Sequence, residues 1–286
     1  MFQIGKDRVA LVSDSSCDLS DEQLAAYDIR LISLRVATTK GDFRDRAELT
    51  NAQVFELLKT ELPKTSLPRP EDAVLLYQQL KDEGCTRVLH ISISSGLSGT
   101  FQMLQLIAET EEDLKIDLVD SRTLASGLGL LVLRAGEDLS RGMSIEETIA
   151  DVEHARETQL GCYMVRTLEY LRKGGRIGLV EGVVGSLLQI KPVIFVNDDG
   201  VYQTLVKARG LNNARRAMVD EVVRRYTGKP IQMAIVHANV PEDAAALEEE
   251  MKQKLQVVSS YIAPVSPALA IHTGEGLLGI IAQIAE

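Results

Sequence analysis

Two hydrophobic patterns alternate along the first half of the chain. Short apolar runs at 9–13, 29–36, 87–93 and 116–119 are typical of buried strands. Between and after them, apolar residues recur at i, i+3 and i+4, which predicts helices in "LSDEQLAAY", "LTNAQVFELLKTE", "PEDAVLLYQQLKDEG", 101–109, "TLASGLGLLVLRAGEDL" and "SIEETIADVEHARETQ". Strands that alternate with helices predict an α/β fold with a mainly parallel sheet.

The pattern changes after about residue 160. Helices are predicted at 213–225 and 242–254, and Asp199-Gly200 predicts a hairpin turn. Short strands are predicted for "GCYMV", "KPVIFV", "VYQTLV", 231–237, 256–262 and 269–271. We therefore expect two domains, an N-terminal α/β domain at 1–160 and a C-terminal α+β domain with a mixed sheet at 161–286, which suits a chain of 286 residues.

Composition narrows the class of protein. Hydrophobic residues make up 45% and charged residues 25% of the chain, as in ordinary globular proteins. A net charge of −10, 4% aromatic residues and the absence of Trp argue against a nucleic-acid-binding surface. The sequence has no apolar run of membrane-spanning length, its start does not read as a signal peptide, so none is expected, and its three cysteines lie far apart. We expect a cytoplasmic protein without a metal site, a disulfide framework or an integral membrane segment.

The segment "SISSGLSGT" at 92–100 places five hydroxyl groups and two glycines between a predicted strand and a predicted helix. It is not a nucleophile elbow, because Gly99 comes one position too early for G-x-S-x-G. It is not a Walker loop either, since the chain contains no G-K-[ST] sequence. A helix that begins here would direct free N–H groups at an anion, although a simple capped helix explains the segment as well.

A second glycine-rich segment, "HTGEGLLG" at 272–279, matches G-x-G-x-x-G and is predicted to follow a strand and open a helix. The chain ends before the acidic residue that a dinucleotide site needs, so we expect a more general anion site with His272 at its edge. "PKTSLPRP" at 63–70 adds Thr65 and Ser66 on a predicted rigid loop. Three such loops without a catalytic carboxylate or metal set favour binding of a carboxylate over its conversion.

Two further polar groups have open interpretations. The basic run "LRKGGRIG" is either a solvated turn or a site for a phosphate or an acidic partner. Asp14, Asp18 and Asp120 follow strands, where catalytic carboxylates are common in α/β proteins. Helix capping explains Asp14 and Asp18 equally well.

Eight segments together resemble the DegV family of bacterial fatty-acid-binding proteins, in the same order and over nearly the whole chain. They are "VSDSSCDLS", "KTSLPRP", "SISSGLSGT", "LVDSRTLASGLG", "YLRKGGRIG", "LLQIKPVI", "KARG" and "HTGEG".

The resemblance implies two domains with a long-chain fatty acid buried in a tunnel between them. It implies that the carboxylate is held by Thr65 and Ser95, with Ser94 and Ser98 as alternative serines and His272 close to the head group. A C16 or C18 tail is well suited to burial, and the hydroxyl groups offset the desolvation of the carboxylate. The same loops make three neighbours further candidates for this site: Ser66, Gly96 and Thr273.

The resemblance also implies a role without catalysis or a cofactor. Several family members present the bound fatty acid to a separate ATP-dependent fatty acid kinase, which converts it to acyl phosphate. On this basis, four basic residues are candidates for contact with the kinase or its phosphate: Arg172, Lys173, Arg176 and Arg209.

The chain departs from the family pattern at two places. Glu275 replaces the usual Pro, and Leu67 and Arg69 change the loop that follows Thr65. A carboxylate beside the head group would repel it, so we expect Glu275 to point to solvent.

Two other function classes stay open. One is a hydrolase, or another α/β enzyme acting on an acyl or phosphate substrate, that uses Ser94, Ser95 or Ser98 with His272. The other is a regulatory module that senses lipid.

Overall fold

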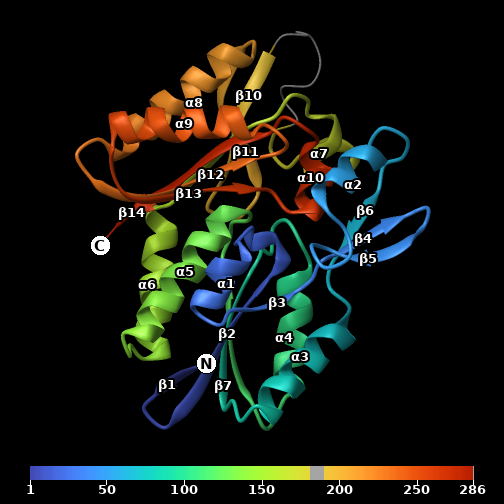
Figure 1. Cartoon of the computed structure of the whole chain (residues 1–286), viewed down its shortest axis with the longest axis vertical. Coiled ribbons are helices and arrows are strands. Elements are labelled where there is room, and N and C mark those ends of the chain that lie inside the picture. The colour runs from blue at the N-terminus through green and yellow to red at the C-terminus, as the bar shows by residue number, and fades with distance from the viewer. Residues whose placement is uncertain (181–189, 286) are drawn as a thin grey trace.

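The computed structural model describes residues 1–180 and 190–285, which form two large sheets with helices packed on and between them (Figure 1). The strands of the first sheet come from residues 2–120 and those of the second from residues 160–284. The α/β fold class is confirmed, and the division of the chain at residue 160 stays a prediction. Residues 187–189, which open the segment "LLQIKPVI", lie outside the described residues.

The first sheet has the order β1-β2-β7-β8, with β3 also paired to β2. β2, β3, β7 and β8 run parallel and β1 is antiparallel. Every residue of β7 is buried, as expected for a parallel strand covered on both faces. The strands are β1 (Phe2–Ile4), β2 (Asp7–Asp14), β3 (Arg30–Ile32), β7 (Arg87–Ser92) and β8 (Lys115–Asp120).

Alternate residues of β2 pack into two different hydrophobic cores, one on each face of the sheet. Ala10 and Val12 pack with α3 (Pro70–Asp82) and α4 (Thr100–Thr110), whereas Val9 and Leu11 face α5 (Ser126–Ser140). The remaining helices of this half are the 3-10 turn η1 (Ser15–Cys17), α1 (Asp21–Ala26), α2 (Asn51–Leu57) and α6 (Ile145–Thr158).

A small antiparallel sheet with the order β5-β4-β6 lies beside the first sheet (Figure 1). Its strands are β4 (Arg35–Thr38), β5 (Gly41–Arg44) and β6 (Lys64–Ser66). The rigid loop predicted for 63–70 is wrong at 64–66, because these residues pair with β4. A three-residue strand between prolines is too short for hydrophobic periodicity to reveal.

The second sheet is mixed, with the order β11-β10-β9-β14-β12-β13, in which β12 and β13 are parallel. Its strands are β9 (Leu160–Met164), β10 (Ile190–Val196), β11 (Tyr202–Arg209), β12 (Pro230–His237), β13 (Gln256–Pro264) and β14 (Leu278–Ile284). Its helices are α7 (Glu169–Lys173), α8 (Leu211–Tyr226), α9 (Pro241–Lys254) and α10 (Pro267–Thr273).

The helix α5 joins the two halves, because it contacts β2 and β7 of the first sheet and β12 and β14 of the second. One apolar core therefore contains residues of both sheets, including Leu89 and Ile281. A Cβ atom on Gly129 would lie 2.4 Å from the carbonyl oxygen of Cys17, so glycine allows α5 to pack closely on η1. The shared core fixes one half against the other.

The strand predicted at 269–271 is wrong, because these residues belong to the helix α10. Ser266 caps this helix with its side chain, Pro267 occupies its first turn, and Gly274 with φ +68° follows its end. "HTGEGLLG" therefore ends a helix and leads into the strand β14. The strand-to-helix anion site predicted at 272–279 does not form.

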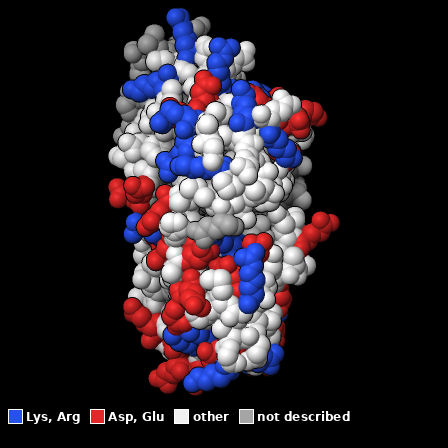
Figure 2. All heavy atoms as spheres, turned by 90° about the vertical axis from the view of Figure 1, so that its left-hand side faces the viewer, with Lys and Arg blue, Asp and Glu red and all other residues white. Residues whose placement is uncertain are grey.

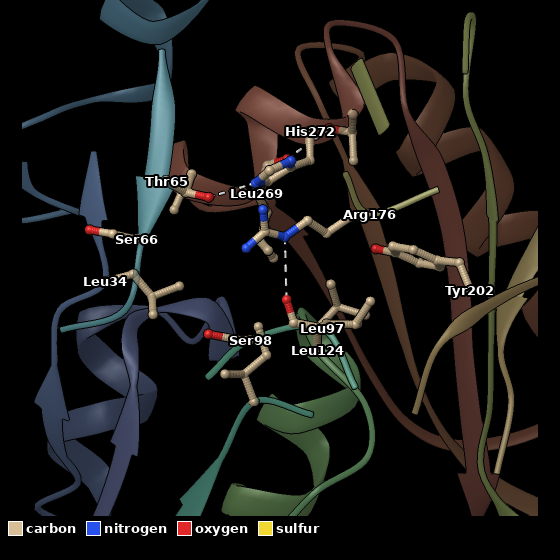
Figure 3. A pocket seen from close by; sticks show the side chains of 13 residues that line it. Leu34, Thr65, Ser66, Leu97, Ser98, Leu124, Arg176, Tyr202, Leu269 and His272 are labelled. Atoms are coloured by element: carbon tan, nitrogen blue, oxygen red, sulfur yellow. Dashed lines mark hydrogen bonds between the residues drawn. The ribbon is translucent and has the colours of Figure 1, made fainter. Parts of the chain in front are cut away.

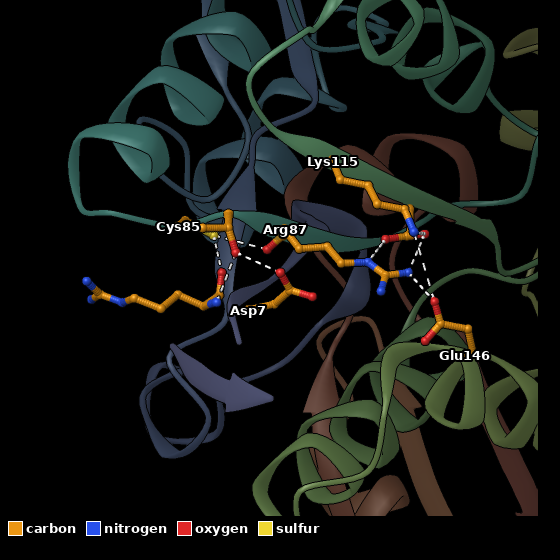
Figure 4. A network of polar contacts seen from close by, with 8 residues as sticks. Asp7, Cys85, Arg87, Lys115 and Glu146 are labelled. Atoms are coloured by element: carbon orange, nitrogen blue, oxygen red, sulfur yellow. Dashed lines mark hydrogen bonds and ion pairs between the residues drawn. The ribbon is translucent and has the colours of Figure 1, made fainter. Parts of the chain in front are cut away.

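A polar network ties the first sheet to α6 (Figure 4). The Arg87 guanidinium donates to Asp117 on β8 and to Glu146 on α6, at 2.6 and 2.7 Å. Lys115 lies 3.7 Å from the same aspartate. These ion pairs lie at the start of β7, whereas the segment at 92–100 begins at its other end, and they join β7 and β8 to α6.

Among the described residues, no helix is both long and apolar enough to cross a membrane.

Candidate functional site

A pocket opens between β6, the 93–98 segment, α10 and the residues that follow α7 (Figure 3). Its apolar wall consists of Leu34, Ile93, Leu97, Leu124, Tyr202, Ala268 and Leu269. Its polar lining consists of Thr65, Ser66, Ser98, Arg176, His272 and Thr273. We call it the Thr65 pocket. An apolar wall with a few convergent polar groups is typical of small-molecule sites.

Thr65 and His272 form the central polar contact of the Thr65 pocket. The Thr65 hydroxyl lies 2.6 Å from His272 Nε2, although 207 positions separate the two residues. Pairing of β6 with β4 places Thr65 opposite Val36 and fixes its direction. The hydroxyl of the next residue, Ser66, points away from the pocket centre in Figure 3, as alternation along a strand requires.

His272 is held as a neutral imidazole. Burial and the positive charge of Arg176 lower its pKa from 6.5 to about 4. Its Nδ1 atom is buried and makes no hydrogen bond with any described residue. The backbone of Gly174 packs against the ring so closely that a Cβ atom there would lie 2.1 Å from Nδ1. The ring is therefore fixed by packing on one side and by Thr65 on the other.

Arg176 brings a positive charge into this largely apolar pocket. Its Nη1 donates to the carbonyl oxygen of Gly174 at 2.7 Å, and its Nε donates to that of Leu97 at 3.4 Å. Figure 3 shows the guanidinium directed towards Thr65. Arg176, a candidate for contact with a kinase or its phosphate, lines the Thr65 pocket in the structure.

The 94–100 segment directs most of its polar groups away from the Thr65 pocket. Ser94 donates to the carbonyl oxygen of Gly200 at 2.7 Å, and Ser95 donates to Asp120 Oδ2 at 2.6 Å. Gly96 packs on the turn between β10 and β11, where a Cβ atom would lie 2.8 Å from two carbonyl oxygens. The segment supplies a different hydroxyl, that of Ser98, to the pocket lining.

The structure thus brings some sequence candidates together and separates others. Ser98 lies 2.8 Å from the Thr100 hydroxyl and lines the pocket with Thr65 and His272. Thr273 also lines it, but its hydroxyl donates to the carbonyl oxygen of Leu269 within α10. Three candidates are not among the lining residues: Ser94, Ser95 and Gly96.

The other basic candidates lie outside the pocket lining. Arg172 and Lys173 are exposed on α7, and Lys173 pairs with Glu169 at 2.5 Å. Arg209 ends the strand β11. Glu275 is exposed and accepts a hydrogen bond from Asn239, so its carboxylate does not face Thr65.

The aspartates that follow strands have structural partners. Asp14 accepts hydrogen bonds from the backbone N–H groups of Ser16 and Ile93, and Asp120 holds Ser95. Burial raises the pKa of Asp14. These contacts support the capping interpretation for Asp14. In the described ranges, no group of three His, Cys, Asp or Glu side chains could hold a metal ion.

Comparison with known proteins identifies one family. The family model described as "Uncharacterised protein, DegV family COG1307" matches residues 8–285. A DegV domain-containing protein of Clostridium acetobutylicum is 34% identical over 275 residues, which cover 96% of this chain and 98% of that protein. Protein DegV of Bacillus subtilis is 31% identical, with 95% and 98% of the two chains covered.

Solved structures agree with the sequence matches. A DegV family protein from Thermus thermophilus, described with fatty acid binding, has a TM-score of 0.91 and 32% identity, with 97% of this chain and 100% of that chain covered. The Bacillus subtilis DegV structure, described as a fatty acid binding protein, has a TM-score of 0.88 and 30% identity, with 98% and 100% covered.

Proposed function

Because the chain belongs to the DegV family, we propose that it binds a long-chain fatty acid with the carboxylate in the Thr65 pocket. The observation that carries this proposal is the Thr65–His272 contact beside the Arg176 guanidinium, in a cavity whose other walls are largely apolar. The fatty-acid binding described for the two solved relatives supports the same ligand class.

The polar groups have complementary roles in this proposal. Arg176 supplies the positive charge that a desolvated carboxylate needs, and hydrogen bonds between charged groups are stronger than neutral ones. Neutral His272 donates from Nε2 to the Thr65 oxygen, so that the hydroxyl proton is free to bind the carboxylate. Ser98 donates from the opposite side of the Thr65 pocket. We therefore replace Ser95, which is bonded to Asp120, by Ser98 as the serine of the head-group site.

The apolar residues of the pocket form the start of the path for the acyl chain in this proposal. Leu34, Leu97, Leu124 and Leu269 surround the space next to the polar groups in Figure 3. Each buried CH₂ group contributes about 0.8 kcal/mol, so a long tail supplies most of the binding free energy. The carboxylate contacts then select an acid over a neutral lipid.

A serine hydrolase receives less support from the same geometry. A nucleophilic serine needs a hydrogen-bonded base, but His272 is bonded to Thr65, and Ser94, Ser95 and Ser98 each bond to another group. Within the described residues, no serine of this segment bonds to a histidine. We therefore propose a carrier without catalytic activity of its own.

Presentation of the fatty acid to an ATP-dependent fatty acid kinase, in the cytoplasm, completes the proposal. Arg172 and Lys173 lie exposed on α7, close in sequence to Arg176. Figure 2 shows basic side chains gathered on the upper half of one face. The helix α8 carries four arginines, Arg215, Arg216, Arg224 and Arg225. Figure 1 places α8 on the side opposite to α7 and α10, so we assign the kinase contact to α7, with Arg209 at the end of β11 as an additional candidate.

The test begins with the ligand. Protein purified from a bacterial host is expected to release a long-chain fatty acid on solvent extraction, identified by mass spectrometry, and to bind palmitate or oleate again after delipidation. Absence of an acyl chain together with absence of binding would refute the carrier. Acyl phosphate should form when loaded protein is mixed with a fatty acid kinase and ATP, and the double variant Arg172→Ala/Lys173→Ala should slow this step without weakening palmitate binding.

A further inference from the structure

A second cavity of about 300 Å³ lies on the other side of the start of α10. It is lined by the segment that follows η1, by the segment between β5 and α2, and by residues 262–267 of the C-terminal half. Its polar side chains include Asp18, Arg46 and Asn51. It shares no lining residue with the Thr65 pocket. We call it the Asp18 pocket.

Asp18 has one carboxylate oxygen that the protein does not use. The side chain is 5% exposed, and its Oδ1 accepts a hydrogen bond of 2.8 Å from the backbone N–H of Ser266. Its Oδ2 is buried and has no hydrogen-bond partner among the described residues. A buried carboxylate oxygen without a donor is costly, because desolvation is not compensated.

Arg46 and Asn51 each have a buried polar atom without a hydrogen-bond partner among the described residues. Arg46 Nη2 donates to the carbonyl oxygen of Leu19 at 2.6 Å, while its buried Nη1 has no partner in the described part of the chain. Asn51 Nδ2 donates to the carbonyl oxygen of Val265 at 2.7 Å. This contact fixes the amide, so that the atom left without a described partner is Oδ1, a hydrogen-bond acceptor.

These three atoms define the chemistry of a ligand. Asp18 Oδ2 and Asn51 Oδ1 require donors, and Arg46 Nη1 requires an acceptor. No ion pair joins Asp18 to Arg46 among the described contacts, and Arg46 Nη2 lies 3.7 Å from the exposed carboxylate of Asp21. Burial raises the pKa of Asp18, and an ammonium group beside Oδ2 would favour the charged form. An ammonium group satisfies the two acceptors, and an acidic group satisfies the guanidinium.

We propose that the Asp18 pocket binds a small zwitterion that carries an ammonium group and an acidic group, as a free α-amino acid does. A simple anion would have to lie beside the Asp18 carboxylate, and a simple cation beside Arg46. A zwitterion matches both charges. The remaining polar side chains of the lining are Ser20, Gln23, Thr50 and Ser266. They cap the helices α1, α2 and α10, so their positions around the pocket are fixed.

The first experiment measures binding to the delipidated full-length protein. The standard L-α-amino acids are tested one at a time by thermal shift and isothermal titration calorimetry. The expected result is that at least one of them raises the unfolding midpoint and binds with a stoichiometry of one. The matched amine without the carboxylate and the matched acid without the amine should bind at least tenfold more weakly. If no amino acid binds, or if the amine or acid alone binds equally well, the proposal is overturned.

The second experiment locates the binding. Asp18→Asn keeps an oxygen to accept from Ser266 but replaces the free acceptor by an N–H donor, so amino-acid affinity should fall at least tenfold. Arg46→Gly removes the guanidinium at a residue with φ +62°, a conformation that glycine adopts readily. Its amino-acid affinity should also fall at least tenfold. Glu22→Gln, an exposed change on α1 outside the pocket lining, is the matched control and should bind as the parent does.

Palmitate binding is measured in the same variants and separates this proposal from the fatty-acid one. A cooperative urea transition shows that Asp18→Asn or Arg46→Gly is folded. Arg46→Gly, which removes a guanidinium bonded to Leu19 and not to α10, should also keep the palmitate affinity of the parent. Parent-like amino-acid affinity in both folded variants would place the ligand elsewhere and refute the assignment to the Asp18 pocket.

Discussion

Replacement of Thr65 by valine isolates the hydroxyl contact that the fatty-acid proposal depends on. Valine has nearly the same shape as threonine and is equally suited to the strand β6, so the pairing with β4 should persist. The change removes the only hydroxyl that contacts His272 in the described residues. The Arg176 guanidinium and the apolar walls of the Thr65 pocket remain.

The expected loss of affinity follows from the type of hydrogen bond removed. A hydrogen bond to a charged group contributes about 1.5–3 kcal/mol. Since 1.4 kcal/mol corresponds to a factor of ten, palmitate should bind about 10- to 150-fold more weakly to Thr65→Val. His272 Nε2 loses its partner in the free protein as well as in the complex, so this second loss lowers the free energy of unfolding rather than the affinity.

Isothermal titration calorimetry on delipidated protein tests this prediction with palmitate and with methyl palmitate. The ester has no negative charge, so Thr65→Val should weaken its binding by much less. Thr65→Ser keeps the hydroxyl and should retain palmitate affinity to within about threefold of the parent. If folded Thr65→Val binds palmitate as the parent does, or if acid and ester lose affinity equally, Thr65 does not hold the carboxylate.

Three further predictions concern the same pocket. Gly174→Ala should displace the His272 ring and weaken palmitate binding at least tenfold in calorimetry, whereas Gly99→Ala, whose Cβ atom has 3.7 Å to its nearest neighbour, should change it less than twofold. Ser98→Ala should weaken palmitate binding severalfold and Ser95→Ala should not, and the reverse order would restore Ser95 to the site. The folded-state pKa of His272, about 4, lies below the unfolded value of 6.5, so the unfolded chain takes up the proton first and stability falls as the pH decreases from about 6.5 to about 4. Between pH 7 and pH 5, the free energy of unfolding measured with urea should fall by about 2 kcal/mol less in His272→Gln than in the parent. Equal decreases in parent and variant would contradict a buried neutral imidazole.

Regular periodicity made most of the fold predictable. The apolar run at 87–93 and the helical spacing at 145–158 are strong signals, and the structure has β7 and α6 at these places. The failure at 269–271 has a physical cause, because "ALAI" is too short to distinguish a strand from a buried helix. The decisive signals were the Ser266 cap, Pro267 at the first helical position and Gly274 after the end.

The direction of individual side chains could not be predicted from the sequence. Whether Ser95 or Ser98 faces the Thr65 pocket depends on Asp120 and on the turn at Gly200, which lie 25 and 105 positions away from Ser95. Arg176 belongs to a run whose composition is that of a solvated turn, and its place in the pocket wall results from the carbonyl oxygens of Gly174 and Leu97. Contacts of this kind depend on tertiary structure, which a single sequence specifies only through the complete fold.

The buried polar residues that follow β2 hold the helix α10, which lines the Thr65 pocket. Ser15 donates to Asp45 at 2.6 Å, and Asp45 accepts from the backbone N–H of Ala268 at 2.9 Å. Asp18 accepts a hydrogen bond from the backbone N–H of Ser266, so two carboxylates of the N-terminal half hold the first turn of α10. The other end of this short helix carries His272, which orients Thr65 in our proposal. On the fatty-acid proposal, the segment "VSDSSCDLS" would contribute to ligand binding by positioning α10 rather than by contact with the ligand.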